Sequence, residues 1–226
     1  MSPTEEKIDT AALLERLKMV RERIRRAAER SGRSPDAVRL IAVSKGHGVE
    51  AVHVLKDAGV EDFGENYLSE LEEKASVIPA RWHFQGRLQR RKIRTILNYS
   101  RSLLSVSREE EIREIEKRAS EPVECYLEVN VGGEETKGGV PPDRLGALVR
   151  AAREATKIRL CGLMTIPPFA EEAEESRKYF ALLRDLAREW EIEGLSMGMS
   201  NDFEVAIEEG ATMVRIGTAL FGPRRK

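Results

Sequence analysis

Residues 38–45 read VRLIAVSK, a nearly continuous apolar run of strand length that ends in a serine and a lysine. Residues 49–58 then have helical character and close on Gly59, so this stretch predicts a strand followed by a helix. The same alternation continues along the chain. Further strands are expected at residues 62–65, 81–86, 102–107, 124–131, 159–166, 194–200 and 213–217, and helices at residues 67–75, 90–97, 109–118, 143–155, 173–190 and 203–209.

Strict alternation of strands and helices implies a parallel sheet, and eight such units can close into a barrel. An open doubly wound sheet more often has five or six strands and a glycine-rich first turn, and no GxGxxG motif follows the first strand here. We therefore predict a single α/β domain over residues 1–226, a (β/α)8 TIM barrel. Residues 1–33 add an N-terminal helix that packs on the barrel, with its apolar stripe at Leu13, Leu17, Val20, Ile24 and Ala28.

The overall composition argues against several partners. The chain has 38 basic and 39 acidic side chains and a net charge of −1, so no long-range field draws it to nucleic acid or anionic lipid. Basic residues gather from Arg87 to Arg94 at the start of a helix, where a solvated face is favoured over a site for an anionic partner. No apolar run approaches the ~20 residues of a membrane span, and no secretory signal is present.

Both cysteines, Cys125 and Cys161, lie in apolar runs, which suits buried thiols in a reducing compartment. A cytoplasmic protein is expected. Three histidines without acidic ligand spacing predict no metal site, although His83 and Gln85 share the face of their strand that makes the barrel interior polar. The glycine-rich loop at residues 132–139 is either a mobile lid or simply a flexible loop, and the sequence leaves both open.

Working residues of such barrels lie at the carboxyl ends of the strands. Lys45 ends the first strand, and alternation places it with Ile41 and Val43 on the side that can face the apolar interior. Partial desolvation makes an amine there easier to deprotonate and able to condense with a carbonyl as a Schiff base. The alternative is an ordinary lysine that extends from the strand end into solvent.

The last two strands offer a phosphate site. Ser200, Gly217 and Thr218 follow them, where this architecture commonly binds phosphate, although Ser200 can also cap a helix and Gly217 can simply turn the chain. Arg215 should point into the barrel as a permanent cation. An internal salt bridge to Glu128 is the alternative explanation for it.

Six motifs occur together, in order, from residue 38 onward: AVSK at 42–45, FGENY at 63–67, WHF at 82–84, GLMTI at 162–166, LSMGMSND at 195–202, and VRIGT at 214–218 with Phe221-Gly222. This set resembles the pyridoxal phosphate homeostasis proteins, also called the proline synthase co-transcribed family, which share a barrel with the amino-terminal domain of alanine racemase. The resemblance implies that Lys45 holds pyridoxal 5′-phosphate (PLP) as a Schiff base and that Ser200, Gly217 and Thr218 hold its phosphate. It also implies that Arg215 faces the pyridine nitrogen and that Asn66 and Met164 lie near the ring.

An arginine at the pyridine nitrogen opposes protonation there, which makes the ring a weaker electron sink. Two departures from the family pattern stand out. Gly46-His47-Gly48 follows the lysine in place of a Thr-Lys-Pro-like stretch, which could alter the entrance, and Arg87 and Arg91 replace a typical histidine and asparagine.

Three functions compete. A non-catalytic PLP-binding protein, with PLP-dependent apo-enzymes as recipients, is favoured over an amino-acid racemase, because two-base racemisation uses a tyrosine from a second domain and this chain stops at Lys226. None of its own tyrosines is expected at a strand's carboxyl end, although Tyr67 opens a helix close by. A barrel enzyme acting on a small sugar phosphate would explain the phosphate loops but not the whole motif set. Without the second domain, a monomer is expected.

Overall fold

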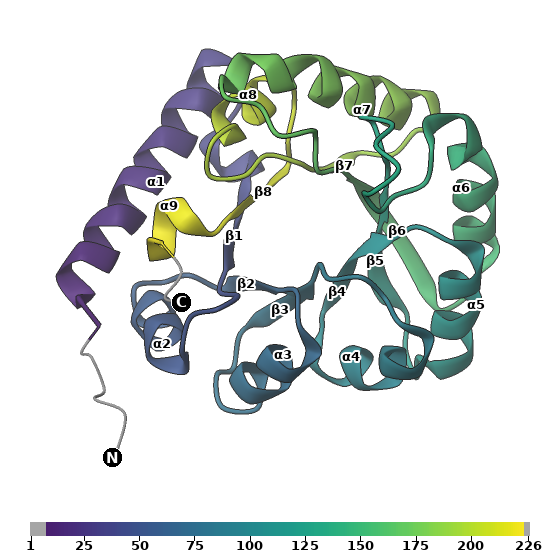
Figure 1. Ribbon diagram of the computed structural model, residues 1–226, viewed down its shortest axis with the longest axis horizontal. Coiled ribbons are helices and arrows are strands. Elements are labelled where there is room, and N and C mark those ends of the chain that lie inside the picture. Colours follow the sequence, from purple (N-terminus) through teal and green to yellow (C-terminus); the bar gives the residue numbers. More distant parts are fainter. Residues whose placement is uncertain (1–7, 224–226) are drawn as a thin grey trace.

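The computed structural model describes residues 8–223, and these form a closed barrel of eight parallel strands in chain order (Figure 1). The last strand pairs with the first, with Ile41 opposite Arg215, and this closes the ring. The predicted (β/α)8 TIM barrel is confirmed. The strands are β1 (Arg39–Val43), β2 (Asp62–Glu65), β3 (Arg81–Phe84), β4 (Ser102–Val106), β5 (Val123–Glu128), β6 (Ile158–Met164), β7 (Gly194–Ser196) and β8 (Met213–Ile216).

Helices surround the barrel and follow the predicted order. They are α1 (Thr10–Arg30), α2 (Val49–Asp57), α3 (Leu68–Ala75), α4 (Ile93–Tyr99), α5 (Glu109–Arg118), α6 (Leu145–Glu154), α7 (Arg177–Glu189), α8 (Phe203–Glu208) and α9 (Thr218–Phe221). Three predicted helices begin as short 3-10 turns, Arg90–Lys92, Pro142–Arg144 and Ala173–Ser176. Helix α9 was not predicted, because four residues are too few to show a helical period.

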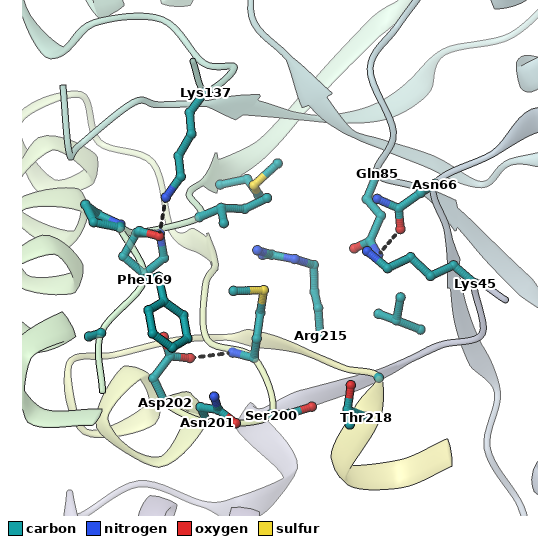
Figure 2. Close-up of a pocket in the computed structure, with 18 residues that line it drawn as sticks. Lys45, Asn66, Gln85, Lys137, Phe169, Ser200, Asn201, Asp202, Arg215 and Thr218 are labelled. Carbon is teal, nitrogen blue, oxygen red and sulfur yellow. Dashed lines mark hydrogen bonds between the residues drawn. The ribbon is translucent and has the colours of Figure 1, made fainter. Parts of the chain in front are cut away.

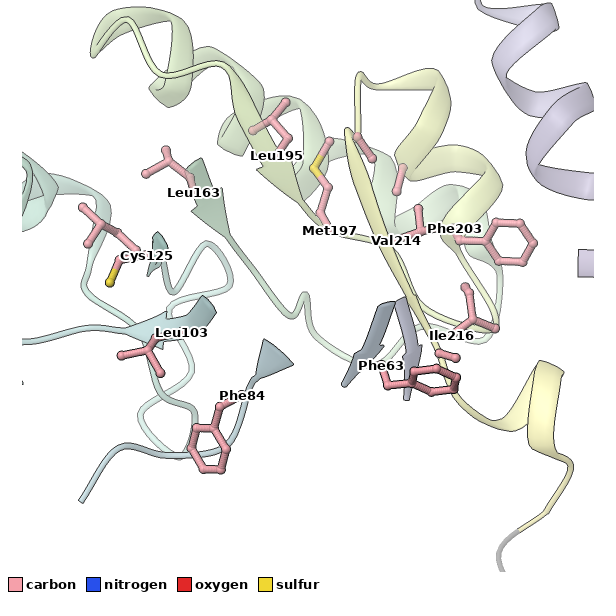
Figure 3. Close-up of a cluster of buried hydrophobic side chains, with 14 of the residues drawn as sticks. Phe63, Phe84, Leu103, Cys125, Leu163, Leu195, Met197, Phe203, Val214 and Ile216 are labelled. Carbon is pink, nitrogen blue, oxygen red and sulfur yellow. The ribbon is translucent and has the colours of Figure 1, made fainter. Parts of the chain in front are cut away.

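The main core lies between the strands and the helices. Side chains that alternate outward from the strands, such as Phe63, Leu103 and Val214, are fully buried there (Figure 3). Cys125 belongs to this layer, as expected for a buried thiol. Cys161 is only partly buried, contrary to expectation, because it packs at the edge of a smaller cluster inside the barrel.

The barrel interior also holds polar groups, as predicted from His83. Its Nδ1 lies 2.6 Å from Ser102 Oγ and its Nε2 lies 2.8 Å from Asp62 Oδ1. Burial raises the pKa of Asp62, but hydrogen bonds from His83 and Arg81 outweigh this and hold the pKa below its ordinary value. Although serine, histidine and aspartate follow the order of a hydrolase triad, Ser102 and His83 have no exposed surface. The chain of bonds therefore satisfies buried polar groups rather than meeting a substrate.

Helix α1 lies along the outside of the barrel beside α8 and α9 (Figure 1). Its predicted apolar stripe is buried, and Arg16 Nε donates to Leu220 O at 2.8 Å while Arg23 pairs with Glu204 at 2.7 Å. Residues 1–7, the start of the predicted N-terminal segment, and 224–226 lie outside the described residues. Among residues 8–223, no helix is long and apolar enough to cross a membrane.

Candidate functional site

A cavity of about 470 Å³ opens at the carboxyl ends of the strands (Figure 2). Its wall comes from residues of β1, β6 and β8, from the segments after β1, β2, β3, β6, β7 and β8, and from the loop before α6. All seven residues that the sequence analysis assigned to cofactor binding line this one cavity: Lys45, Asn66, Met164, Ser200, Arg215, Gly217 and Thr218.

The amine of Lys45 lies near Gln85, whose side-chain oxygen has no hydrogen-bond partner. Lys45 is the second residue after β1, and its side chain extends toward Asn66 and Gln85, each the first residue after its strand (Figure 2). Gln85 Nε2 donates to Asn66 Oδ1 at 3.0 Å, but the buried Gln85 Oε1 accepts no hydrogen bond. Buried acceptors are normally paired, so this oxygen fits a pocket whose ligand brings a donor.

Arg215 crosses the middle of the cavity and is only 3% exposed (Figure 2). Its guanidinium donates to Ser196 O at 2.7 Å, to Ser196 Oγ at 2.8 Å and to Thr165 O at 2.9 Å. These acceptors, and not an ion pair with Glu128, hold it. Burial lowers the pKa of Arg215 to about 10, partly offset by the negative charges of Glu128 and Asp202, so the group stays cationic at neutral pH.

The phosphate end of the predicted site is built from loops. Strand β7 stops at Ser196, earlier than predicted. Gly198 O still accepts from Arg215 N–H at 3.0 Å, and the φ of +91 at Gly198 then turns the chain away from β8. Ser200 therefore lies in a loop, where its Oγ accepts from the N–H of Ala219 at 3.0 Å. Ser200 thus binds the first turn of α9, the helix that begins at Thr218, and not the start of α8, the helix that directly follows it in the chain. The hydroxyl, the helix start and Gly217 still face one cavity.

The lining includes residues that the sequence analysis missed. Lys137 reaches the cavity from the glycine-rich loop, donates to Pro167 O at 2.8 Å and pairs with Glu134 at 2.6 Å, so the loop is tied to the pocket wall. Phe169, on the loop after β6, is 83% exposed at the cavity. Asp202 also lines it, and burial raises the pKa of its carboxyl. The only sequence signal for these three was their place after strand ends.

The departures from the family pattern lie beside the cavity. Gly46, His47 and Gly48 follow Lys45 directly but do not line it, and an effect of this stretch on the entrance stays a prediction. The His47 ring stacks on Phe221 of α9 with centroids 4.9 Å apart. In the basic cluster, Arg90 pairs with Glu114 at 2.7 Å on the protein's own surface, as in a solvated helix face.

Comparison with known proteins places the chain. Residues 15–225 match the family model described as alanine racemase, N-terminal domain. A pyridoxal phosphate homeostasis protein of Aquifex aeolicus is 44% identical over 223 residues, which cover 93% of this chain and 98% of the relative. This chain belongs to the pyridoxal phosphate homeostasis family.

Solved structures separate the family from its distant relatives. PipY from Synechococcus elongatus, determined with PLP bound, is similar with a TM-score of 0.81 and 30% identity, and the match covers 93% of this chain and 100% of PipY. An alanine racemase from Clostridium difficile has a TM-score of 0.72 at 18% identity, and the match covers 94% of this chain but only 58% of the racemase. At this identity, the similarity to the alanine racemase shows only that the two proteins share the barrel fold.

Proposed function

We propose that this protein binds PLP through Lys45 and serves PLP homeostasis as a holder of the cofactor rather than as an amino-acid enzyme. The observation that carries the proposal is the single cavity that joins an amine, a guanidinium and a hydroxyl beside a helix start. These groups complement the aldehyde, the ring and the phosphate of PLP. PLP bound to PipY, at 30% identity over nearly the whole length of both chains, supports it.

Each end of the cavity then has a role. Lys45 Nζ would hold the cofactor at the β1 end, beside the amides of Asn66 and Gln85. The phosphate would be held by the Ser200 hydroxyl and by Gly217 and Thr218, which line the same end of the cavity. Met164, which lines the cavity from β6, would border the ring.

Arg215 is the reason to expect holding rather than catalysis. PLP supplies an aldehyde for attachment and a ring that accepts electrons when its nitrogen is protonated. Three hydrogen bonds fix the Arg215 guanidinium, so it cannot withdraw from a ring beside it. Its positive charge opposes protonation of the pyridine nitrogen and leaves the ring a weak electron sink.

One observation favours the racemase alternative. Asp202 lines the cavity across from Lys45, and its raised pKa suits a proton-transfer group (Figure 2). However, Asp202 Oδ1 already accepts from Met199 N–H at 2.7 Å, so the carboxylate has a role in folding the loop. Exchange of the α-proton of added alanine, abolished by Asp202→Asn, would establish the alternative.

The finer assignments follow from the same proposal. PLP-dependent apo-enzymes are the recipients, the protein is a monomer in the cytoplasm, and residues 1–226 form one domain. The two free cysteines, Cys125 and Cys161, agree with a reducing compartment. Light scattering tests the monomer, and reactivation of a PLP-dependent apo-enzyme by the loaded protein tests the transfer.

The direct experiment is to add PLP to the purified protein and record its visible absorbance. After unbound PLP, which is itself yellow, is removed, the wild-type protein should stay yellow and Lys45→Ala should be colourless. Lys56→Ala is the matched control. Lys56 lies on α2, pairs with Glu61 at 2.7 Å and does not line the cavity. A wild-type protein that ignores added PLP would refute the proposal.

A further inference from the structure

A fully buried lysine lies directly behind the site. Lys74, on α3, is 1% exposed and does not line the cavity. Its Nζ donates three hydrogen bonds, to Ser44 O at 2.8 Å, to Glu65 Oε1 at 2.6 Å and to Glu70 Oε2 at 2.8 Å. Lysines are seldom buried this completely, so the position calls for a reason beyond helix packing.

The network holds the turn that carries Lys45. His47 N–H donates to Ser44 O at 3.0 Å, which makes Lys45 and Gly46 the central residues of a β-turn. Gly46 has φ +75, a conformation that glycine adopts without strain at the second central position of such a turn. The direction in which the Lys45 side chain leaves the backbone depends on this turn.

Both peptide groups that flank Lys45 are anchored in the same network. The carbonyl before it, Ser44 O, accepts from Lys74 Nζ, and the N–H after it, on Gly46, donates to Glu70 Oε2 at 2.8 Å. Glu70 in turn accepts from Lys74 at 2.8 Å, so one ammonium group secures both sides of the turn.

The other carboxylate links the network to the neighbouring strand. Glu65 Oε1 accepts from Ser44 Oγ at 2.7 Å, and Glu65 Oε2 accepts from the N–H of Asn66 at 3.2 Å. The backbone of Asn66, the next residue of the cavity wall, is therefore held by the same group of side chains. The ammonium, the two carboxylates and the Ser44 hydroxyl all have hydrogen-bond partners, which favours one fixed arrangement.

We propose that Lys74 is a positioning residue for Lys45, because it clamps the turn that aims the Lys45 amine at its carbonyl partner. This inference rests on the proposed attachment of PLP to Lys45. In that step the amine adds to the aldehyde carbon, a C=N bond forms, and the aldehyde oxygen leaves as water with the two amine protons. Lys74 touches neither reacting atom, so its effect falls on the rate of this step and not on binding of the phosphate.

The test separates attachment from binding. The double variant Lys74→Met with Glu65→Gln removes the ammonium without leaving a buried carboxylate unpaired. Two quantities are measured on cofactor-free protein: the rate at which the absorbance of linked PLP appears, and the affinity for pyridoxine 5′-phosphate, which has an alcohol in place of the aldehyde. We expect attachment to slow by at least about tenfold, since small misplacements of a reacting group have effects of this size, and the affinity to change by less than about twofold.

Two further variants complete the comparison. Glu70→Ala removes the acceptor of Gly46 N–H at a site that is 25% exposed, so it decides the question if the double variant does not fold, and we expect it to slow attachment about threefold. Arg108→Met is the matched control, because Arg108 also joins a carboxylate, Glu111, to a backbone carbonyl, Leu88 O, away from the cavity. It should change neither quantity.

The outcomes are distinct. Attachment at the wild-type rate in a folded variant, or rate and affinity falling together, would overturn the positioning role while leaving the proposed function intact. A wild-type protein that binds pyridoxine 5′-phosphate but forms no linkage with PLP would refute the proposed function, and the inference with it.

Discussion

Glutamine in place of Glu128 should change how the protein's stability depends on pH. Glu128 is the last residue of β5, and burial raises its pKa from 4.5 to about 7, although the charge of Arg215 acts in the opposite direction. A carboxyl with a raised pKa binds its proton more tightly in the folded state. Its contribution to folding is therefore complete below pH 4.5 and is lost as the pH rises through 7. The difference between these two pKa values corresponds to about 3 kcal/mol.

Urea unfolding of the cofactor-free proteins, followed by the fluorescence of Trp82 and Trp190, measures the effect. At pH 5 the free energies of unfolding of wild type and Glu128→Gln should lie within about 1 kcal/mol, because protonated glutamate resembles glutamine. From pH 5 to pH 8 the variant should gain about 2–3 kcal/mol relative to wild type. Glu65 and Asp202, whose pKa values burial also raises, are present in both proteins and cancel in the difference. A difference that is the same at pH 5 and pH 8 would refute the reasoning.

Three other substitutions have defined outcomes. Ser200→Ala removes the acceptor of Ala219 N–H and a proposed phosphate contact, so the affinity for PLP should fall about tenfold or more while that for unphosphorylated pyridoxal stays the same, by equilibrium titration. Arg215→Gln leaves buried acceptors unpaired and should lower the free energy of unfolding by roughly 2–4 kcal/mol, and it should raise any α-proton exchange of alanine seen by NMR. Gly198→Ala should cost at least about 1–3 kcal/mol in thermal unfolding, because φ is +91 and the new Cβ would lie 2.9 Å from the Cα of Phe203; an unchanged midpoint would contradict this.

The order of elements was predictable because each strand and each helix carries its own pattern and the two alternate without exception. The residues at which the strands end were less predictable. Residues 194–200 continue the alternation of β7, but the strand ends at Ser196 and a positive φ at Gly198 turns the chain into a loop. Loop residues after a strand are often as regular in sequence as the strand itself, and only the backbone turn distinguishes them.

The residues of the candidate site also differ in how far the sequence predicted them. Lys45 and Arg215 followed from alternation within a strand, which fixes the face of the sheet but not the partner. The sequence therefore could not decide whether Arg215 forms a salt bridge with Glu128. In the structure its guanidinium donates to Ser196 and Thr165 instead. Asn66 and Met164 came from family resemblance alone.

Residues brought in by loops gave no signal beyond their place after strand ends, and those brought in by helix packing gave none. Lys137 enters the cavity through contacts with a loop 30 residues away in sequence. Lys74 stands in a helix rich in charged residues and would pass for a surface lysine. Its burial depends on the packing of α3 against the turn after β1, which is a tertiary contact and not a local pattern.

The attachment of PLP to Lys45 is the central claim, and borohydride reduction of the PLP-loaded protein followed by peptide mapping tests it most directly. Reduction fixes the linkage on whichever amine carries it. The prediction is one modified residue per chain, at Lys45, and none in Lys45→Ala. Modification at Lys137, the other lysine among residues 8–223 that lines the cavity, or no modification at all, would contradict it.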